Sequence, residues 1–177
     1  MTMSSVRLLR SLIILPLLLW VNDTHVSAAP IEIERVIAEL QPQTTLPIWM
    51  PDEVPGLEQV YISLYTTSGL YSIYFDLTPD CGGATYCNYG SFTAEQDGQF
   101  WTPDDLGPRD EIAFIRFENG MSGQFVNTCG PYCTAKVQWR LGGILYNATI
   151  KNGTQAATVD LANNILQGDV RAQGTAQ

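Results

Sequence analysis

The stretch AKVQWRLGGILYNATI, residues 135–150, predicts two antiparallel strands joined by a tight turn. Its first half alternates apolar and polar residues with a period of two, which is typical of a strand with one packed and one wet face. The apolar set is Ala135, Val137, Trp139 and Leu141, and the polar set is Lys136, Gln138 and Arg140. Gly142 and Gly143 then favour a turn into the second strand.

The same two-residue period recurs upstream. Residues 59–65 and 70–77 flank the turn sequence TTSG and predict a hairpin. Further strands are expected at residues 84–94, 111–117 and 121–127, with a long loop from Glu95 to Asp110. Together with residues 135–141 and 144–150 these make about seven strands. Short polar turns between most of them favour an antiparallel meander with one packed face.

Two helices are expected at the ends of this sheet. Residues 30–41 space their apolar side chains at helical intervals, and so do residues 158–167, which Gly168 follows. A proline-rich connector, residues 42–56, separates the first helix from the strands. We therefore predict an α+β fold: an antiparallel sheet of about seven strands, an N-terminal and a C-terminal helix, and two disulfide-clamped loops. Residues 29–177 form a single domain with a flexible tail from about residue 169.

The N-terminus indicates export. Arg7 and Arg10 precede an apolar run, residues 12–21, and small residues follow at 27–29. This order is typical of a secretory signal peptide, and the run has about half of the ~20 residues that a membrane-spanning helix needs. We predict a signal peptide over residues 1–28, a secreted or periplasmic protein, and no membrane span after cleavage. The alternative is an uncleaved signal that anchors the domain.

Charge and composition exclude several functions. The chain carries 9 basic and 18 acidic residues, a net charge of −9, which disfavours a nucleic-acid partner. Its single histidine, His25, lies in the predicted signal peptide. Nucleophilic sites built on histidine are therefore excluded from the mature domain. We expect no cofactor and no metal.

Four cysteines remain after export: Cys81, Cys87, Cys129 and Cys133. In an oxidising compartment an even count indicates disulfides, and three pairings are possible. We favour the two local pairs, each contributing about 2 kcal/mol by loop closure, over crossed pairs. A redox pair would require Cys-x-x-Cys spacing, and zinc would require four converging thiolates, so both alternatives are weaker.

Three segments carry a resemblance. LPIWMPDEVP, YSIYFDLTPDCGGATYCNYGSF and GMSGQFVNTCGPYCTAKVQWRLGGILYNATI, which begin at residues 46, 71 and 120, resemble a family of exported bacterial proteins, chiefly from cyanobacteria. The resemblance covers residues 46–167, and its markers are a Cys-Gly-Gly-Ala…Cys loop and a Cys-Gly-x-x-Cys loop. It implies one secreted domain. It implies no activity and no catalytic residues.

Aromatic side chains are the candidate ligand contacts. Trp101 lies in the long loop among carboxylates, and Tyr61, Tyr65 and Tyr74 lie opposite the aliphatic residues of the first hairpin. The tyrosines form either an exposed platform for a glycan or peptide, or part of a covered sheet face. The carboxylates are Glu95, Asp97, Asp104, Asp105, Asp110 and Glu111. Two of them beside Trp101 would suit a glycosidase, or several would hold calcium, although the calcium-loop spacing is missing.

The sequence therefore favours an exported, disulfide-stabilised domain with a non-enzymatic binding or structural role in the cell envelope. Its partner is expected to be an envelope polymer or protein. The alternative is a carbohydrate-acting enzyme that uses loop carboxylates near Trp101. A third possibility is an assembly subunit recognised through an exposed strand edge.

Overall fold

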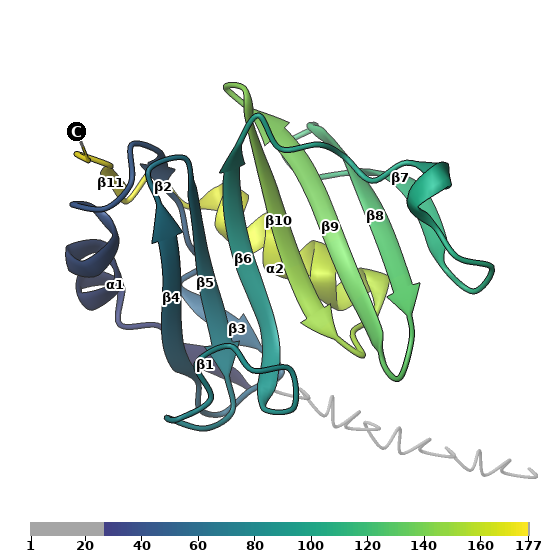
Figure 1. Ribbon diagram of the computed structural model, residues 1–177, viewed down its shortest axis with the longest axis horizontal. Helices are drawn as coiled ribbons and strands as arrows, with labels where there is room; N and C mark the ends of the chain where they lie inside the picture. The colour runs from purple at the N-terminus through teal and green to yellow at the C-terminus, as the bar shows by residue number, and fades with distance from the viewer. Residues whose placement is uncertain (1–26, 177) are drawn as a thin grey trace, which may run out of the picture.

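Seven strands form one antiparallel sheet in the spatial order β4-β5-β6-β10-β9-β8-β7 (Figure 1). The strands are Tyr61–Thr67 (β4), Leu70–Asp76 (β5), Asn88–Gln96 (β6), Glu111–Arg116 (β7), Ser122–Cys129 (β8), Cys133–Leu141 (β9) and Ile144–Lys151 (β10). This computed structural model describes residues 27–176. The predicted signal peptide lies outside the described residues except for Ser27 and Ala28, so it stays a prediction. The predicted seven-strand antiparallel sheet is confirmed.

The order of the strands departs from the predicted meander. After β6 the chain crosses to the far edge of the sheet through residues 97–110, and β10 then returns to pair with β6. Alternation in the sequence determines which residues share a face, whereas it does not determine which strands are neighbours. Gly90 permits the pairing, because a Cβ at this position would collide with the backbone oxygen of Thr149.

The fold is mostly β, and neither helix ends the chain. Helix α1 (Ile33–Leu40) follows a short strand, β1 (Ala28–Pro30), and α2 (Gln155–Gln167) precedes another, β11 (Ala172–Gln173). Both expected helices therefore form, one before and one after the main sheet in the chain, but a short strand lies outside each of them, so their terminal placement is not confirmed. Helix α2 begins before residue 158 because the Thr154 side chain accepts a hydrogen bond from the Ala157 N–H at 3.2 Å. No helix within residues 27–176 is long and apolar enough to cross a bilayer.

Two small sheets fix the segments outside the main sheet. Strand β1 pairs with β3 (Glu53–Pro55), and β11 pairs with β2 (Pro47–Ile48). Backbone groups of residues 174–176 also pair with the connector: Ala176 donates its N–H to the Thr44 oxygen at 3.0 Å, and Gly174 donates to the Leu46 oxygen at 3.1 Å. The expected flexibility of the tail from residue 169 stays a prediction.

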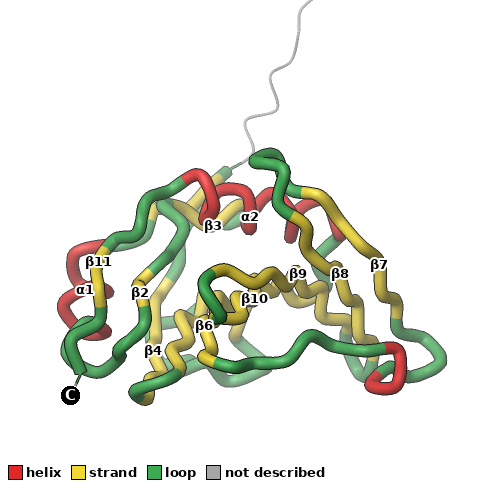
Figure 2. The backbone as a smooth tube through the Cα atoms, turned by 90° about the horizontal axis from the view of Figure 1, so that it is seen from above, coloured by secondary structure: helices red, strands yellow, loops and turns green. Residues whose placement is uncertain are grey.

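Helix α2 lies across β9 and β10 on one face of the sheet, and residues 97–106 lie on the opposite face (Figures 1 and 2). On the helix side, Trp139 stacks on Tyr146 with ring centroids 5.7 Å apart and on Phe92 at 6.0 Å. All three side chains are at most 2% exposed. This face, which we call the core face, carries the hydrophobic core.

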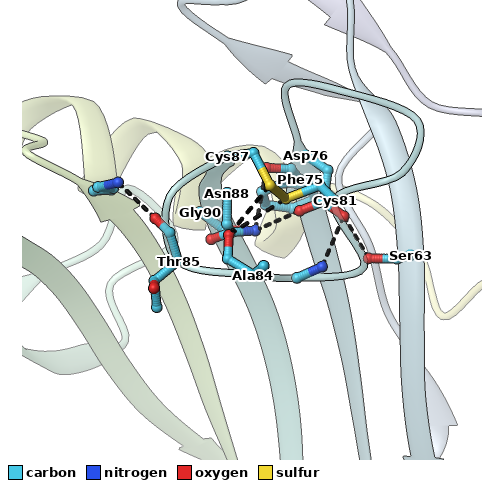
Figure 3. Close-up of a disulfide and its surroundings, with 11 residues drawn as sticks. Ser63, Phe75, Asp76, Cys81, Ala84, Thr85, Cys87, Asn88 and Gly90 are labelled. Carbon is cyan, nitrogen blue, oxygen red and sulfur yellow. Dashed lines mark hydrogen bonds between the residues drawn. A yellow bond between two sulfur atoms is a disulfide. The ribbon is translucent and has the colours of Figure 1, made fainter.

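Both local disulfides form, as predicted: Cys81–Cys87 and Cys129–Cys133, with Cα atoms 5.7 and 4.1 Å apart. The first clamp closes a turn, so β6 starts at Asn88 and not at the predicted Ala84. Beneath it, the buried carboxylate of Asp76 accepts hydrogen bonds from the Ser63 hydroxyl at 2.5 Å and the Gly83 N–H at 3.0 Å (Figure 3). Asp76 thereby joins the first hairpin to the clamped loop.

Candidate functional site

The face opposite the core face, which we call the outer face, carries a continuous row of hydrogen-bonding side chains. The row follows the register across five neighbouring strands and consists of Ser72, Thr93, Asn147, Gln138 and Gln124. The Ser72 and Thr93 hydroxyls lie 3.0 Å apart, and Gln138 donates to the Asn147 side-chain oxygen at 2.7 Å. We call this set the polar row.

A groove of 240 Å³ lies over the middle of the polar row. Hydroxyl, amide and charged side chains from β6, β10 and β9 form its floor, and Trp101 forms one wall. The lining residues are Ser91, Thr93, Glu95, Gln99, Trp101, Lys136, Gln138, Leu145, Asn147 and Thr149. This set defines the outer groove, and its many hydrogen-bonding groups suit a ligand rich in hydroxyls.

The long loop is attached to the sheet at Trp101 through backbone hydrogen bonds. The Trp101 N–H donates to the Gln138 side-chain oxygen at 3.1 Å, and the Trp101 carbonyl accepts from the Gln124 side-chain amide at 2.7 Å. Gln124 and Gln138 are both buried beneath the loop. Arg140 also donates to the Gly98 carbonyl. These bonds involve only the backbone of residue 101, and its half-buried ring lines the outer groove.

Lys136 and Glu95 are the charged residues of the outer groove. The Lys136 ammonium lies 4.5 Å from the centroid of the Trp101 ring, a cation–π distance. Burial lowers the pKa of Lys136, and the nearby Glu95 carboxylate opposes that shift by raising it. The two opposite charges leave the groove with no net charge.

A second, apolar groove of 470 Å³ lies on the other side of Trp101. Its apolar lining consists of Phe100, Trp101, Pro103, Ile112, Ala113 and Phe114. Phe114 projects from β7 and is 93% exposed. Trp101 therefore separates a polar groove over the middle of the sheet from an apolar groove at its β7 edge.

The predicted tyrosines do not join Trp101 in one site. Tyr61, Tyr65 and Tyr74 lie on β4 and β5, and the register places all three on the outer face. Tyr65 is exposed, whereas Tyr61 and Tyr74 are half-buried. Four strand spacings, roughly 19 Å, separate β4 from β9 beneath Trp101. Tyr74 is instead a neighbour of the first clamp, since a Cβ at Gly83 would lie 3.0 Å from its ring.

The loop carboxylates are dispersed. Asp105 accepts hydrogen bonds from the Thr102 N–H and hydroxyl, which lower its pKa, and Asp110 accepts from the Cys129 and Gly107 N–H groups with the same effect. Glu95 is the only one of the six that lines the outer groove. A glycosidase needs two carboxylates on opposite sides of the scissile bond, and this groove supplies one. Within residues 27–176 no group of three or more metal-ligating side chains comes together.

Sequence reasoning identified Trp101 and the outward direction of Lys136 and Gln138, but not the partners that complete the groove. Thr93 and Asn147 come from β6 and β10, which are far apart in the sequence and become neighbours only through the β6–β10 pairing. The available signal was the alternation in residues 144–150, which places Asn147 and Thr149 on the polar side.

Comparisons with protein-family models, with curated proteins and with solved structures found no match to this chain. The resemblance to exported bacterial proteins therefore stays a prediction.

Proposed function

We propose that this protein is an exported, non-enzymatic domain that binds a neutral, hydroxyl-rich polymer of the cell envelope in its outer groove. The observation that carries the proposal is the polar row beside Trp101. Thr93 and Asn147 present a hydroxyl and an amide next to an aromatic ring. Sugars offer both hydroxyls for such groups and apolar C–H faces for a ring.

Charge favours a neutral polymer. The chain has a net charge of −9, so a polyanion would be repelled at long range. Inside the groove, the positive charge of Lys136 is balanced by the negative charge of Glu95. The remaining lining groups are mainly neutral donors and acceptors, which recognise hydroxyls without requiring a charged partner.

The proposed location is the periplasm or the exterior of the cell. Two disulfides support an oxidising compartment outside the cytoplasm. The predicted signal peptide would deliver the chain there. A non-enzymatic role is supported by the single carboxylate of the outer groove, Glu95.

Trp101→Ala should weaken binding about 30-fold, because the ring is the largest apolar surface of the outer groove and such anchors contribute about 2 kcal/mol or more. The measurement is retardation in native gels that contain dextran or xylan, with the polyanion alginate as the polymer that should not retard the protein. The backbone bonds of residue 101 persist in this variant, so the loop stays in place.

Tyr86→Ala is the matched control, because Tyr86 is 80% exposed on the first clamped loop and does not line the outer groove. Equal retardation of the wild-type protein and Trp101→Ala by every polymer would contradict the proposal. New reducing ends released from a bound polymer by the wild-type protein, and lost in Glu95→Gln, would favour the carbohydrate-acting enzyme instead.

A further inference from the structure

Two tyrosines continue the outer face beyond the outer groove, toward the β4 edge of the sheet. Tyr65 on β4 lies opposite Ser72, the β5 member of the polar row. Tyr74 lies opposite Ser91, which lines the outer groove. Tyr65 is 55% exposed and Tyr74 is half-buried. Because opposite residues on neighbouring strands are in contact and diagonal neighbours are within reach of aromatic rings, the two tyrosines form a stepped aromatic surface next to the groove.

The long loop determines the direction in which a bound chain can extend. Residues 97–106 leave β6 toward β7 and cross the outer face on that side (Figure 2). They bury Gln138 and Gln124, so the polar row is covered at this end. On the other side of Trp101, Thr93 and Asn147 are only half-buried. A ligand that lies against Trp101 therefore continues along the polar row toward Tyr65.

The side chains along this path present no charge to a ligand. Thr93 and Asn147 supply a hydroxyl and an amide, and the Ser91 hydroxyl lies 2.8 Å from that of Thr149. Asp76 shares the outer face with Tyr74, but its carboxylate is 1% exposed and accepts hydrogen bonds from within the protein. Aromatic surfaces at both ends of the path, with neutral donors and acceptors between them, match a neutral chain of linked sugars that lies across the strands.

The separation of the aromatic side chains sets the length of the ligand. Roughly 19 Å, four strand spacings, separates β4 from β9 beneath Trp101. A single sugar is no larger than the indole on which it would stack, so one or two units at Trp101 do not reach Tyr65. Building on the proposed function, we propose that one binding site extends from Trp101 across the polar row to Tyr74 and Tyr65. Its ligand is a linear stretch of several linked sugar units.

Isothermal titration calorimetry with xylo-oligosaccharides and isomalto-oligosaccharides, from the disaccharide to the hexasaccharide, tests the extended site. The affinity of the wild-type protein should rise about tenfold or more over this range of lengths, because longer chains reach a second aromatic anchor. Tyr65→Ala should weaken binding of the hexasaccharide about tenfold and leave binding of the disaccharide unchanged. Trp101→Ala should weaken binding at every length.

Tyr65→Phe is the matched control, because it keeps the ring and should retain the affinity for the hexasaccharide. Tyr65 is exposed, so both variants should fold, which circular dichroism checks. Equal wild-type affinity for all lengths would overturn the extended site. So would a Tyr65→Ala protein that binds the hexasaccharide like the wild type, or one that loses affinity equally at all lengths.

These results are distinguishable from a failure of the proposed function. If length or Tyr65 has no effect while Trp101→Ala still weakens binding, the outer groove binds sugars and only its extension is wrong. If the wild-type protein binds no oligosaccharide and neither dextran nor xylan retards it, the proposed function is contradicted and the extended site with it.

Discussion

Trp139→Ala is expected to lower the free energy of unfolding by about 4 kcal/mol. Trp139 is 1% exposed and packs at the centre of the core face, where its ring contacts Tyr146, Phe92 and Phe117. Truncation removes this apolar burial and leaves a cavity that three fixed rings do not fill. The expected loss is a large share of the total stability of a domain of this size.

Urea denaturation followed by far-ultraviolet circular dichroism measures this loss. Leu141→Ala is the matched control, because Leu141 lies two residues further along the same strand and is 39% exposed. Its expected cost is below about 1 kcal/mol. If Trp139→Ala costs no more than Leu141→Ala, the core face has been assigned incorrectly.

Asp76→Ala is expected to cost about 3 kcal/mol. The carboxylate is 1% exposed and accepts from the Ser63 hydroxyl, the Gly83 N–H and the Asn88 side-chain amide (Figure 3). Alanine leaves the Ser63 hydroxyl and the Gly83 N–H without their partner, whereas the Asn88 amide keeps its bonds to the Phe75 and Gly90 carbonyls. An unsatisfied donor at a poorly hydrated site is costly. The hairpin and the clamped loop would also lose their shared anchor.

Asp80→Ala is the control for this change, because Asp80 is an exposed carboxylate one residue before Cys81. It should shift the free energy of unfolding by no more than about 0.5 kcal/mol. The same urea experiment compares the two variants. Equal stability of Asp76→Ala and Asp80→Ala would show that the hydrogen bonds of Asp76 contribute nothing to the folded state.

Local patterns predicted the strands, and long-range pairing accounts for what they missed. Residues 135–150 alternate so regularly that strands β9 and β10, their turn and the buried position of Trp139 all follow from the sequence. The neighbour of β10 on its other side is β6, which ends 48 residues before β10 begins. No periodicity encodes that choice, because it depends on the path of the loop between β6 and β7.

The candidate site was likewise predictable in its local residues but not in the long-range contacts that assemble it. Trp101 stood out as an aromatic residue in a long loop, but its position over β9 depends on hydrogen bonds to Gln124 and Gln138. Alternation along their strands predicts that these two glutamines face solvent. In the structure both are buried under the loop. The strand in the tail was equally unpredictable from the sequence, because β11 is two residues long and forms only through its pairing with β2.

The proposed binding of a polymer at the outer face is tested most directly by nuclear magnetic resonance of the labelled protein, during titration with the polymer that retards it most. We expect chemical-shift changes at the Trp101 indole and at the side-chain amides of Asn147 and Gln138, with the core face and both clamped loops unaffected. Changes confined to the clamped loops, or no change with any polymer at saturating concentration, would contradict the claim.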